Sequence, residues 1–470
     1  GTLQDFDTLV AATHDHGLKI IIDQVLSHTS DQHAWFQESR QSRSNPKADW
    51  YVWADASAFG EPPNNWVSVF GGSAWQWDEL RQQYYLHNFL TSQPDLNFHC
   101  EAMRSQLLLE MAFWLDRGVD GFRLDAINFC YHDKQLRSNP VKPVEQRVGR
   151  GFSPDNPYAA QYHYYDNTQP ENELFLQDIR ALTDRYPGTV TLGEINSENS
   201  MKTLAEYTRG EKRLHMGYSF ELLADEFSPQ HIETTVTTME SELDNGWPCW
   251  AISNHDVSRV VSRWGKGVYH DQLARMLLTM AASLKGSLCV YQGEELGLTQ
   301  ATIERHEVRD PFGLQFWPHF KGRDGCRTPM PWCANDQHAG FSTAEPWLKI
   351  PQEHKAMSVE RQENDLQSVL HYYRQFLAFR AQSAALIAGD MQFLHTDSQC
   401  LVFERRIKDE SLLCCFNLSE RIAYISLSEF DGSQTRKSPQ PVKLNNATLI
   451  KMGGSRSQLE LAPYGFAFLN

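Results

Sequence analysis

The stretch Gly118–Ala126, with the sequence GVDGFRLDA, is a short apolar run that ends in a carboxylate. A helix-like pattern over Glu101–Asp116 precedes it, so a helix and a strand follow one another here. The same rhythm indicates an α/β fold built on a parallel sheet. We expect five further runs to be buried strands of this sheet: Leu18–Val25, Thr189–Ile195, Met216–Leu223, Trp250–Ser253 and Ser287–Tyr291.

Length and composition limit the class of protein. The chain has 470 residues, of which 41% are hydrophobic and 22% charged, which is typical of a globular protein with a large core. Its net charge of −16 disfavours binding to nucleic acids and anionic membranes. The sequence has no apolar run of ~20 residues, and its nine cysteines form no Cys-x-x-Cys pair. We therefore expect a cytoplasmic protein with reduced thiols.

Two regions depart from the alternating pattern. Residues 29–93 are rich in Trp, Asn, Pro and Gly and are too long for an ordinary loop, so they predict an inserted subdomain. From residue 387 to 470 the pattern changes to short alternating segments, which predict an antiparallel β domain. Residues 1–28 and 94–386 remain as the main α/β domain.

Carboxylates follow four of the expected strands. A single acidic residue at the end of a strand commonly caps a helix or faces solvent. Four in series are different, because a parallel barrel delivers the carboxyl ends of its strands to one mouth. Like charges held together shift each other's pKa values, which is typical of functional sites. The four residues are Asp23, Asp125, Glu194 and Asp256.

The neighbours of these carboxylates indicate a reaction. Arg123 shares a strand face with Asp125, and a guanidinium beside a carboxylate keeps it ionised, as a nucleophile requires. Glu194 follows an apolar strand, and we expect its burial to raise its pKa toward the range of a proton donor. A retaining glycosidase needs one carboxylate of each kind, ~5–5.5 Å apart. His28 and His255 could bind sugar hydroxyl groups.

Several motifs resemble glycoside hydrolase family 13, the α-amylase family, over essentially the whole chain. Two of them, QPDLN and RTPMPW, are similar to the oligo-1,6-glucosidase and α-glucosidase branch. Segments 23–33 and 153–173 resemble bacterial α-glucosidases that act on short substrates. The motifs, in chain order, are Asp23–His28 (DQVLSH), Gln93–Asn97 (QPDLN), Gly121–Ala126 (GFRLDA), Gly193-Glu194, Asn254–Asp256 (NHD) and Arg327–Trp332 (RTPMPW).

The resemblance implies a role for each matching residue. Asp125 would be the nucleophile, Glu194 the general acid/base and Asp256 the third carboxylate, which grips sugar hydroxyls and stabilises the transition state. Asp23 would lie buried behind the glucose subsite, either as a structural partner of its neighbours or as a substrate contact. For Phe89 and Gln93, packing at a helix start and substrate contact both stay open. The remaining residues of the implied glucose subsite are His28, Arg123, His255 and Arg327.

The resemblance implies a retaining exo-α-glucosidase on a (β/α)₈ barrel. Its substrates would be maltose, short α-1,4 oligosaccharides and sucrose, with some transglucosylation. Ala126 follows the nucleophile where enzymes that favour α-1,6 bonds have Val, so it favours α-1,4 cleavage, unless it is small only because a helix packs on it. Three alternatives are a transglucosylase or a sucrose- or trehalose-directed enzyme, an oligo-1,6-glucosidase, and a non-catalytic relative that serves as a transporter subunit.

The sequence also bears on metal sites, on partners and on strands that precede Gly1. Ser27 replaces an Asn that helps to ligate calcium in α-amylases, so no metal site is expected among these residues and no cofactor is required. Six expected strands against the eight of the resembled barrel suggest that two N-terminal strands precede Gly1. That segment leaves room for a structural Ca²⁺ or Mg²⁺. The expected partner is a small sugar, with no nucleic acid or membrane, and the oligomeric state is left open.

Overall fold

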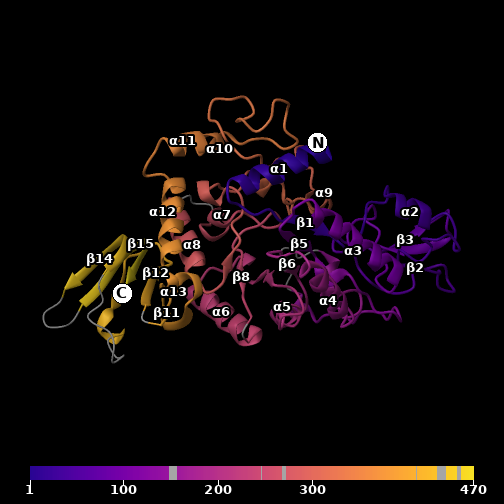
Figure 1. The fold of residues 1–470 in the computed structure, drawn as a ribbon, viewed down its shortest axis with the longest axis horizontal. Helices are drawn as coiled ribbons and strands as arrows, with labels where there is room; N and C mark the ends of the chain where they lie inside the picture. The colour runs from indigo at the N-terminus through magenta and orange to yellow at the C-terminus, as the bar shows by residue number, and fades with distance from the viewer. Residues whose placement is uncertain (148–155, 245, 267–270, 409, 431–440, 452–456) are drawn as a thin grey trace. The chain divides into compact units, whose positions relative to one another are not determined.

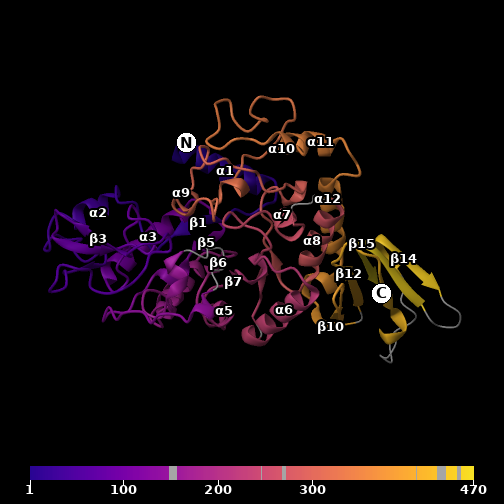
Figure 2. The same ribbon diagram turned by 180° about the vertical axis from the view of Figure 1, so that it is seen from behind.

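The computed structural model describes residues 1–147, 156–244, 246–266, 271–408, 410–430, 441–451 and 457–470 (Figures 1 and 2). Residues 153–155 of the segment that resembles bacterial α-glucosidases lie outside this range. The chain divides into two compact units. The first comprises Gly1–Phe220 with Glu240–Trp247, and the second comprises Glu221–Met239 with Pro248–Asn470.

The first unit contains a four-stranded parallel sheet, which confirms four of the six expected strands. In the described residues the other two, expected at Trp250–Ser253 and Ser287–Tyr291, form a separate parallel pair instead of joining this sheet. The order of the four-stranded sheet is β1-β5-β6-β7, and a helix precedes each of its strands along the chain, as the ribbon shows (Figure 1). Thr2 and Asp5 cap the first of these helices with reciprocal hydrogen bonds. The strands are β1 (Ile22–Val25), β5 (Gly121–Asp125), β6 (Val190–Ile195) and β7 (Met216–Ser219), and the helices are α1 (Leu3–Asp15), α3 (Glu101–Asp116), α4 (Asn172–Thr183) and α5 (Ser200–Thr208).

Strand β1 differs from the prediction. The sequence predicts a buried strand over Leu18–Val25, but the strand begins at Ile22, and Leu18 and Val25 are exposed. In the part of the chain that the structure describes, β1 lies at the edge of its sheet and pairs only with β5. The expected burial of Asp23 is therefore wrong, because its side chain, 54% exposed, extends from this edge strand.

Residues 29–93, between β1 and α3, form a small antiparallel sheet of order β2-β4-β3. Its core is aromatic, with Trp66 and Trp75 stacked at 5.8 Å and both almost fully buried. The elements are α2 (Ala34–Ser39), β2 (Trp53–Ala54), β3 (Trp75–Asp78) and β4 (Gln83–Leu86).

The second unit contains a two-stranded parallel pair, β8 (Cys249–Trp250) and β9 (Ser287–Leu288), with helices before, between and after the two strands. Helix α8 is buried over most of its length, which makes it the central helix of this region. The α-helices from residue 221 onward are α6 (Pro229–Leu243), α7 (Val260–Trp264), α8 (Asp271–Ser283), α9 (Pro311–Phe316), α10 (Gln352–Ala356), α11 (Val359–Glu363), α12 (Val369–Gln382) and α13 (Ala384–Ala388).

The C-terminal part of the second unit is an antiparallel sheet, which confirms the predicted change of architecture. Its order is β10-β11-β12-β15-β13, and β14 also pairs with β15. Alternate residues such as Val402, Leu413 and Leu459 fill an apolar core. The strands are β10 (Asp390–Thr396), β11 (Cys400–Ile407), β12 (Glu410–Asn417), β13 (Ala423–Ser426), β14 (Pro441–Lys451) and β15 (Ser457–Leu469).

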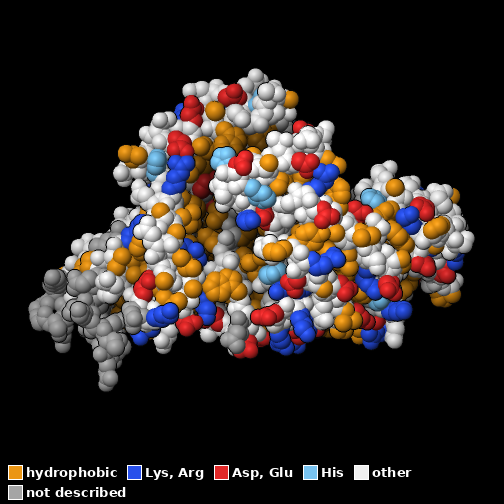
Figure 3. Space-filling view, in the orientation of Figure 1, with side chains coloured by type: hydrophobic (Ala, Val, Ile, Leu, Met, Phe, Trp, Pro, Cys, Tyr) orange, Lys and Arg blue, Asp and Glu red, His pale blue; other side chains and the backbone are white. Residues whose placement is uncertain are grey.

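Short 3₁₀ helices connect several of these elements, and one of them, η1, directly follows β5. Across the described residues, no helix has the length and apolar character needed to cross a bilayer. On the face seen in Figure 3, acidic and basic side chains are intermingled. The 3₁₀ helices are η1 (Ile127–Phe129), η2 (Val144–Gln146), η3 (Pro157–Ala160), η4 (Glu221–Leu223), η5 (Glu294–Leu296), η6 (Asp324–Cys326) and η7 (Leu427–Phe430).

Candidate active site

Strand β5 presents Arg123 and Asp125 on one face, while Phe122 and Leu124 on the opposite face are fully buried. The strand begins at Gly121, where a Cβ atom would lie 2.0 Å from a carbonyl oxygen of β6, so only glycine permits this close approach. The alternation of a central parallel strand thus fixes the direction of both functional side chains.

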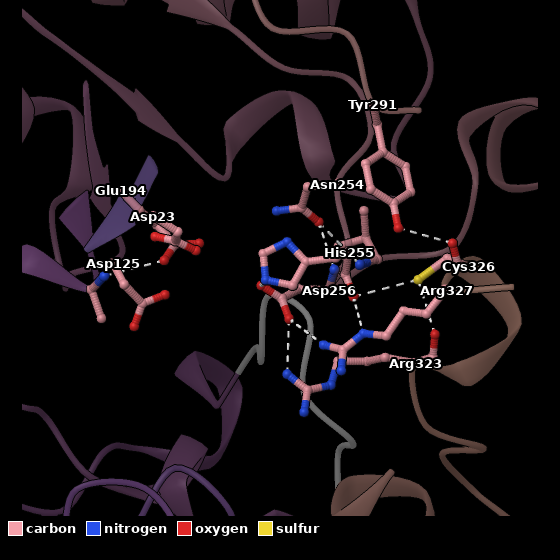
Figure 4. A network of polar contacts seen from close by, with 12 residues as sticks. Asp23, Asp125, Glu194, Asn254, His255, Asp256, Tyr291, Arg323, Cys326 and Arg327 are labelled. Atoms are coloured by element: carbon pink, nitrogen blue, oxygen red, sulfur yellow. Dashed lines mark hydrogen bonds and ion pairs between the residues drawn. The ribbon is translucent and has the colours of Figure 1, made fainter. Parts of the chain in front are cut away.

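Arg123 joins the carboxylates of the first unit. Its Nη1 lies 2.6 Å from Asp125 Oδ1 and 2.8 Å from Asp23 Oδ1, and its Nη2 lies 2.7 Å from Glu194 Oε2. Burial alone would lower the pKa of the guanidinium, but the attraction of the acidic neighbours, that of Glu194 first, raises it above its ordinary value. A permanently charged group therefore holds both the expected nucleophile and the expected proton donor. Figure 4 shows Asp23, Asp125 and Glu194 as one group.

Glu194 lies near the end of β6 and is almost fully buried. Its Oε1 accepts a hydrogen bond from the hydroxyl of Tyr218 on β7, at 3.0 Å, and Tyr218 in turn accepts one from Arg123 Nη2 at 2.9 Å. Its Oε2 accepts from the backbone N–H of Ala126, at 3.2 Å. Ala126 reaches this position in a left-handed conformation, with φ of 39°, at the turn between β5 and η1.

His28 is neutral in this site. Burial lowers its pKa to about 4, although the charge of Asp125 opposes the shift. Gln93 accepts from the N–H of Leu90 through Oε1, so its Nε2 donates to His28 Nε2 at 2.9 Å. The imidazole proton consequently resides on Nδ1, which faces Ser27 Oγ at 3.0 Å.

Phe89 packs against two rings of the first unit. Its ring centroid lies 5.1 Å from that of His28 and 5.1 Å from that of Phe129. The structure therefore places Phe89 beside a predicted site residue, and the ring is only partly buried. Packing against His28 is its observed contact, while contact with a substrate stays a prediction.

In the second unit, Asn254–Asp256 follows β8 and places one oxygen of Asp256 against two arginines (Figure 4). Asp256 Oδ1 lies 2.8 Å from Arg323 Nη1 and 3.1 Å from Arg327 Nη2, while Oδ2 lies 3.3 Å from His255 Nε2. Asn254 Oδ1 accepts from the backbone N–H of Asp256 at 2.8 Å, which closes the turn. Arg327 also donates from Nε to the carbonyl of His255, at 2.7 Å.

Each unit thus gathers its own set of the residues predicted from sequence. The first unit brings together the predicted nucleophile, the predicted proton donor and their shared arginine, and the second unit joins the third carboxylate to its histidine and arginine. The predicted residues of the first unit are Asp23, His28, Phe89, Arg123, Asp125, Ala126 and Glu194, and those of the second are His255, Asp256 and Arg327.

Sequence reasoning missed Tyr218 and Arg323. Tyr218 lies directly opposite Glu194 in the pairing of β6 with β7, and a parallel register cannot be derived from either strand alone. Arg323 also contacts Asp310, whose oxygens lie 2.9–3.0 Å from its guanidinium nitrogens. Arg323 lies four residues before Arg327, and this closeness in sequence to a predicted site residue could have identified it.

Known protein families and curated relatives match most of the chain. A model of the α-amylase catalytic domain matches residues 1–389, and one of the maltogenic amylase C-terminal domain matches residues 391–468. A probable alpha-glucosidase of Rhizobium meliloti is 52% identical over 90% of this chain and 77% of its own length. An oligo-1,6-glucosidase of Parageobacillus thermoglucosidasius is 33% identical over 91% of this chain and 80% of its own length.

Two solved structures extend the comparison to the fold. The alpha-glucosyl transfer enzyme XgtA is 54% identical and superposes with a TM-score of 0.95 over 100% of this chain and 86% of its own. The trehalulose synthase MutB of Pseudomonas mesoacidophila MX-45 is 26% identical, with a TM-score of 0.86 over the same shares. The α/β architecture predicted from the sequence therefore matches that of solved enzymes along the whole chain.

Proposed function

Because the chain belongs to the α-amylase family of glycoside hydrolases, we propose that it is a retaining exo-α-glucosidase. Its substrates are maltose, short α-1,4-linked oligosaccharides and sucrose, from which it releases α-glucose at the non-reducing end. The observation that carries this proposal is the contact of one guanidinium, that of Arg123, with both Asp125 and Glu194. A single bridging group keeps two carboxylates close, as a covalent glycosyl-enzyme route requires.

In the proposed first step, Asp125 attacks the anomeric carbon while Glu194 protonates the leaving glycosidic oxygen. The C–O bond to the aglycone breaks, and an ester bond between Asp125 and glucose forms. Arg123 supports this role because its guanidinium, 2.6 Å from Asp125 Oδ1, holds the attacking carboxylate in place.

In the second step, Glu194 acts as a base and takes a proton from water, whose oxygen attacks the anomeric carbon and displaces Asp125. A sugar hydroxyl in place of water gives transglucosylation by the same proton transfers. We assign Asp256 to the binding of sugar hydroxyls, since two arginines hold its carboxylate in place and its oxygens accept hydrogen bonds. No step of this mechanism uses a metal or a cofactor.

Linkage preference is assigned to Ala126, the residue after the nucleophile. Its small side chain leaves room beside the leaving sugar, and we propose that this favours α-1,4 over α-1,6 bonds. The left-handed turn at this position supplies a second reason for a small residue, because β-branched side chains rarely adopt positive φ. Differences of one or two methyl groups are worth ~1–3 kcal/mol, so the preference is graded.

A second candidate is a transglucosylase that uses the same residues. It is favoured by the 54% identity to a structure named as an alpha-glucosyl transfer enzyme. The ratio of transfer products to free glucose, measured with a rising concentration of a glucose acceptor, separates the two activities.

We also propose a cytoplasmic location, which is supported by the nine cysteines being thiols in the structure.

The test of the proposed function is glucose release from maltose, isomaltose, sucrose, trehalose and maltotetraose side by side. We expect maltose and maltotetraose to be cleaved, with maltose turned over faster than isomaltose. Faster turnover of isomaltose would contradict the assigned linkage preference, and a chain inactive on all five sugars would contradict the proposed function.

A further inference from the structure

Tyr218 joins the two groups on which the proposed proton transfers depend. It lies on β7 opposite Glu194, and both side chains are almost fully buried. Its hydroxyl accepts from Arg123 Nη2 at 2.9 Å and lies 3.0 Å from Glu194 Oε1. A guanidinium can only donate, so the single phenolic proton points toward the Glu194 carboxylate.

The phenol remains protonated throughout. Burial, followed by the negative charge of Glu194, raises the pKa of Tyr218 well above its usual range. Tyr218 therefore does not exchange its own proton with the substrate or with Glu194. It acts on Glu194 only through the direction and strength of one hydrogen bond.

The two oxygens of Glu194 have different neighbours. Oε2 faces the guanidinium of Arg123, at 2.7 Å, and the backbone N–H of Ala126, at 3.2 Å, and both of these groups can only donate. Oε1 faces a hydroxyl, which can donate to a carboxylate and accept from a carboxylic acid. Among these three neighbours, the hydroxyl alone fits both protonation states of a group that must act first as an acid and then as a base.

We infer that Tyr218 is a positioning residue that holds Glu194 and strengthens it as an acid by donating to the conjugate carboxylate. This inference rests on the proposed role of Glu194 as the acid/base. In this step the Glu194 proton passes to the glycosidic oxygen, and the tyrosine hydroxyl donates a hydrogen bond to the carboxylate that remains. Without the hydroxyl, Glu194 keeps its proton to higher pH and protonates poor leaving groups more slowly.

The test compares Tyr218→Phe with the wild type on maltose and on an aryl α-glucoside that carries an activated leaving group. The value of kcat/KM reports the steps through glycosidic cleavage, and an activated phenolate leaves without an acid. We expect kcat/KM for maltose to fall about tenfold and the aryl value to change less than twofold, because one hydrogen bond to a charged group is lost. The alkaline limb of the maltose profile should move up by about one pH unit.

Tyr207→Phe is the matched control. Tyr207, on helix α5 of the same unit, is equally buried. Its hydroxyl accepts a hydrogen bond from Asn172 Nδ2 at 3.0 Å. We expect this variant to keep the wild-type ratio of maltose to aryl-glucoside activity and the wild-type alkaline limb. Both variants retain the phenyl ring, and thermal denaturation checks that each is folded.

The outcomes separate this inference from the proposed function. If Tyr218→Phe loses activity equally on both substrates with an unmoved alkaline limb, or behaves like the wild type, the positioning role is wrong. If the wild type itself cleaves neither substrate, the proposed function is wrong.

Discussion

Two clusters of arginines and carboxylates, one in each unit, distribute charge in opposite ways. In the first unit, one guanidinium contacts three carboxylates. In the second unit, two guanidinium groups contact one carboxylate, and one of the two, that of Arg323, also contacts Asp310. The first cluster is that of Arg123 with Asp23, Asp125 and Glu194, and the second is that of Asp256 with Arg323 and Arg327.

This difference suits different chemical tasks. Where carboxylates outnumber cations, their mutual repulsion makes it easier for one of them to hold a proton, as acid/base chemistry needs. Where two guanidinium groups contact one carboxylate, the carboxylate is held in place as a hydrogen-bond acceptor. We therefore propose proton transfer for the first cluster and substrate binding for the second.

The largest effect is expected for Asp125→Asn. An amide cannot act as the nucleophile, so we expect kcat on maltose to fall at least ~10³-fold. Asp116→Asn is the matched control, since Asp116 accepts a hydrogen bond from Tyr186 at the end of α3, and it should keep wild-type activity. If the variant retains more than about a thousandth of the wild-type activity, Asp125 is not the nucleophile.

Glu194→Gln should show a loss that depends on the leaving group. We expect kcat/KM for maltose to fall ~10²–10³-fold, whereas formation of the glucosyl-enzyme from an activated aryl α-glucoside should be largely spared. Pre-steady-state release of the phenolate measures this step directly. An equal loss on both substrates would contradict the assignment of acid chemistry to this residue.

Arg323→Gln should show that the second cluster also stabilises the protein. Asp310, almost fully buried, would lose its bidentate partner, and an unpaired buried charge costs ~3 kcal/mol. Arg323 lowers the pKa of Asp310 against the effect of burial, so this stabilisation is present at neutral pH and is lost as the pH falls. We expect the variant to be less stable at pH 7, with a smaller difference near pH 3, by urea denaturation. A constant difference would contradict this explanation.

Ala126→Val should change the linkage preference while the protein keeps its overall fold. We expect the ratio of isomaltose to maltose kcat/KM to rise ~10-fold, with a general loss of activity because Val is strained at positive φ. Ala126→Gly relieves the strain without adding bulk and should leave the ratio nearly unchanged. A ratio unaffected by Val would show that Ala126 is small for packing alone.

The smallest effect concerns His28. Its pKa is lowered to about 4 in the folded protein, so the unfolded chain binds the additional proton between about pH 6.5 and pH 4. Stability from His28 is therefore complete above pH 6.5 and declines as the pH falls toward 4. We expect His28→Asn to reduce the drop in Tm between pH 7 and pH 5. An unchanged drop would show that His28 contributes nothing to it.

Part of the site could be predicted because it depends on local periodicity. Arg123 and Asp125 share a face of one strand by the two-residue repeat, and the structure joins them at 2.6 Å. Gly121 and Gly193 stand where a side chain would collide with a neighbour, and both lie in motifs that the sequence analysis quoted. The parallel βα series and the antiparallel C-terminal sheet likewise follow from apolar patterns.

The rest depends on long-range pairing, which one sequence does not contain. An apolar strand such as residues 18–25 looks buried whether it is central or lies at an edge, so the exposure of Asp23 could not be predicted. Tyr218 meets Glu194 only through the register of two strands. Arg323 contacts Asp256 across 67 positions of sequence, from a position just before η6 that belongs to no periodic element.

The stereochemistry of the first product tests the central claim most directly. Proton NMR during the first minutes of maltose hydrolysis distinguishes α-glucose from β-glucose before mutarotation mixes them. A double displacement through Asp125 predicts that the glucose released from the non-reducing end is initially the α anomer. β-Glucose in excess of what the reducing glucose of maltose itself contributes would show a single displacement by water and would contradict the pairing of nucleophile and acid/base around Arg123.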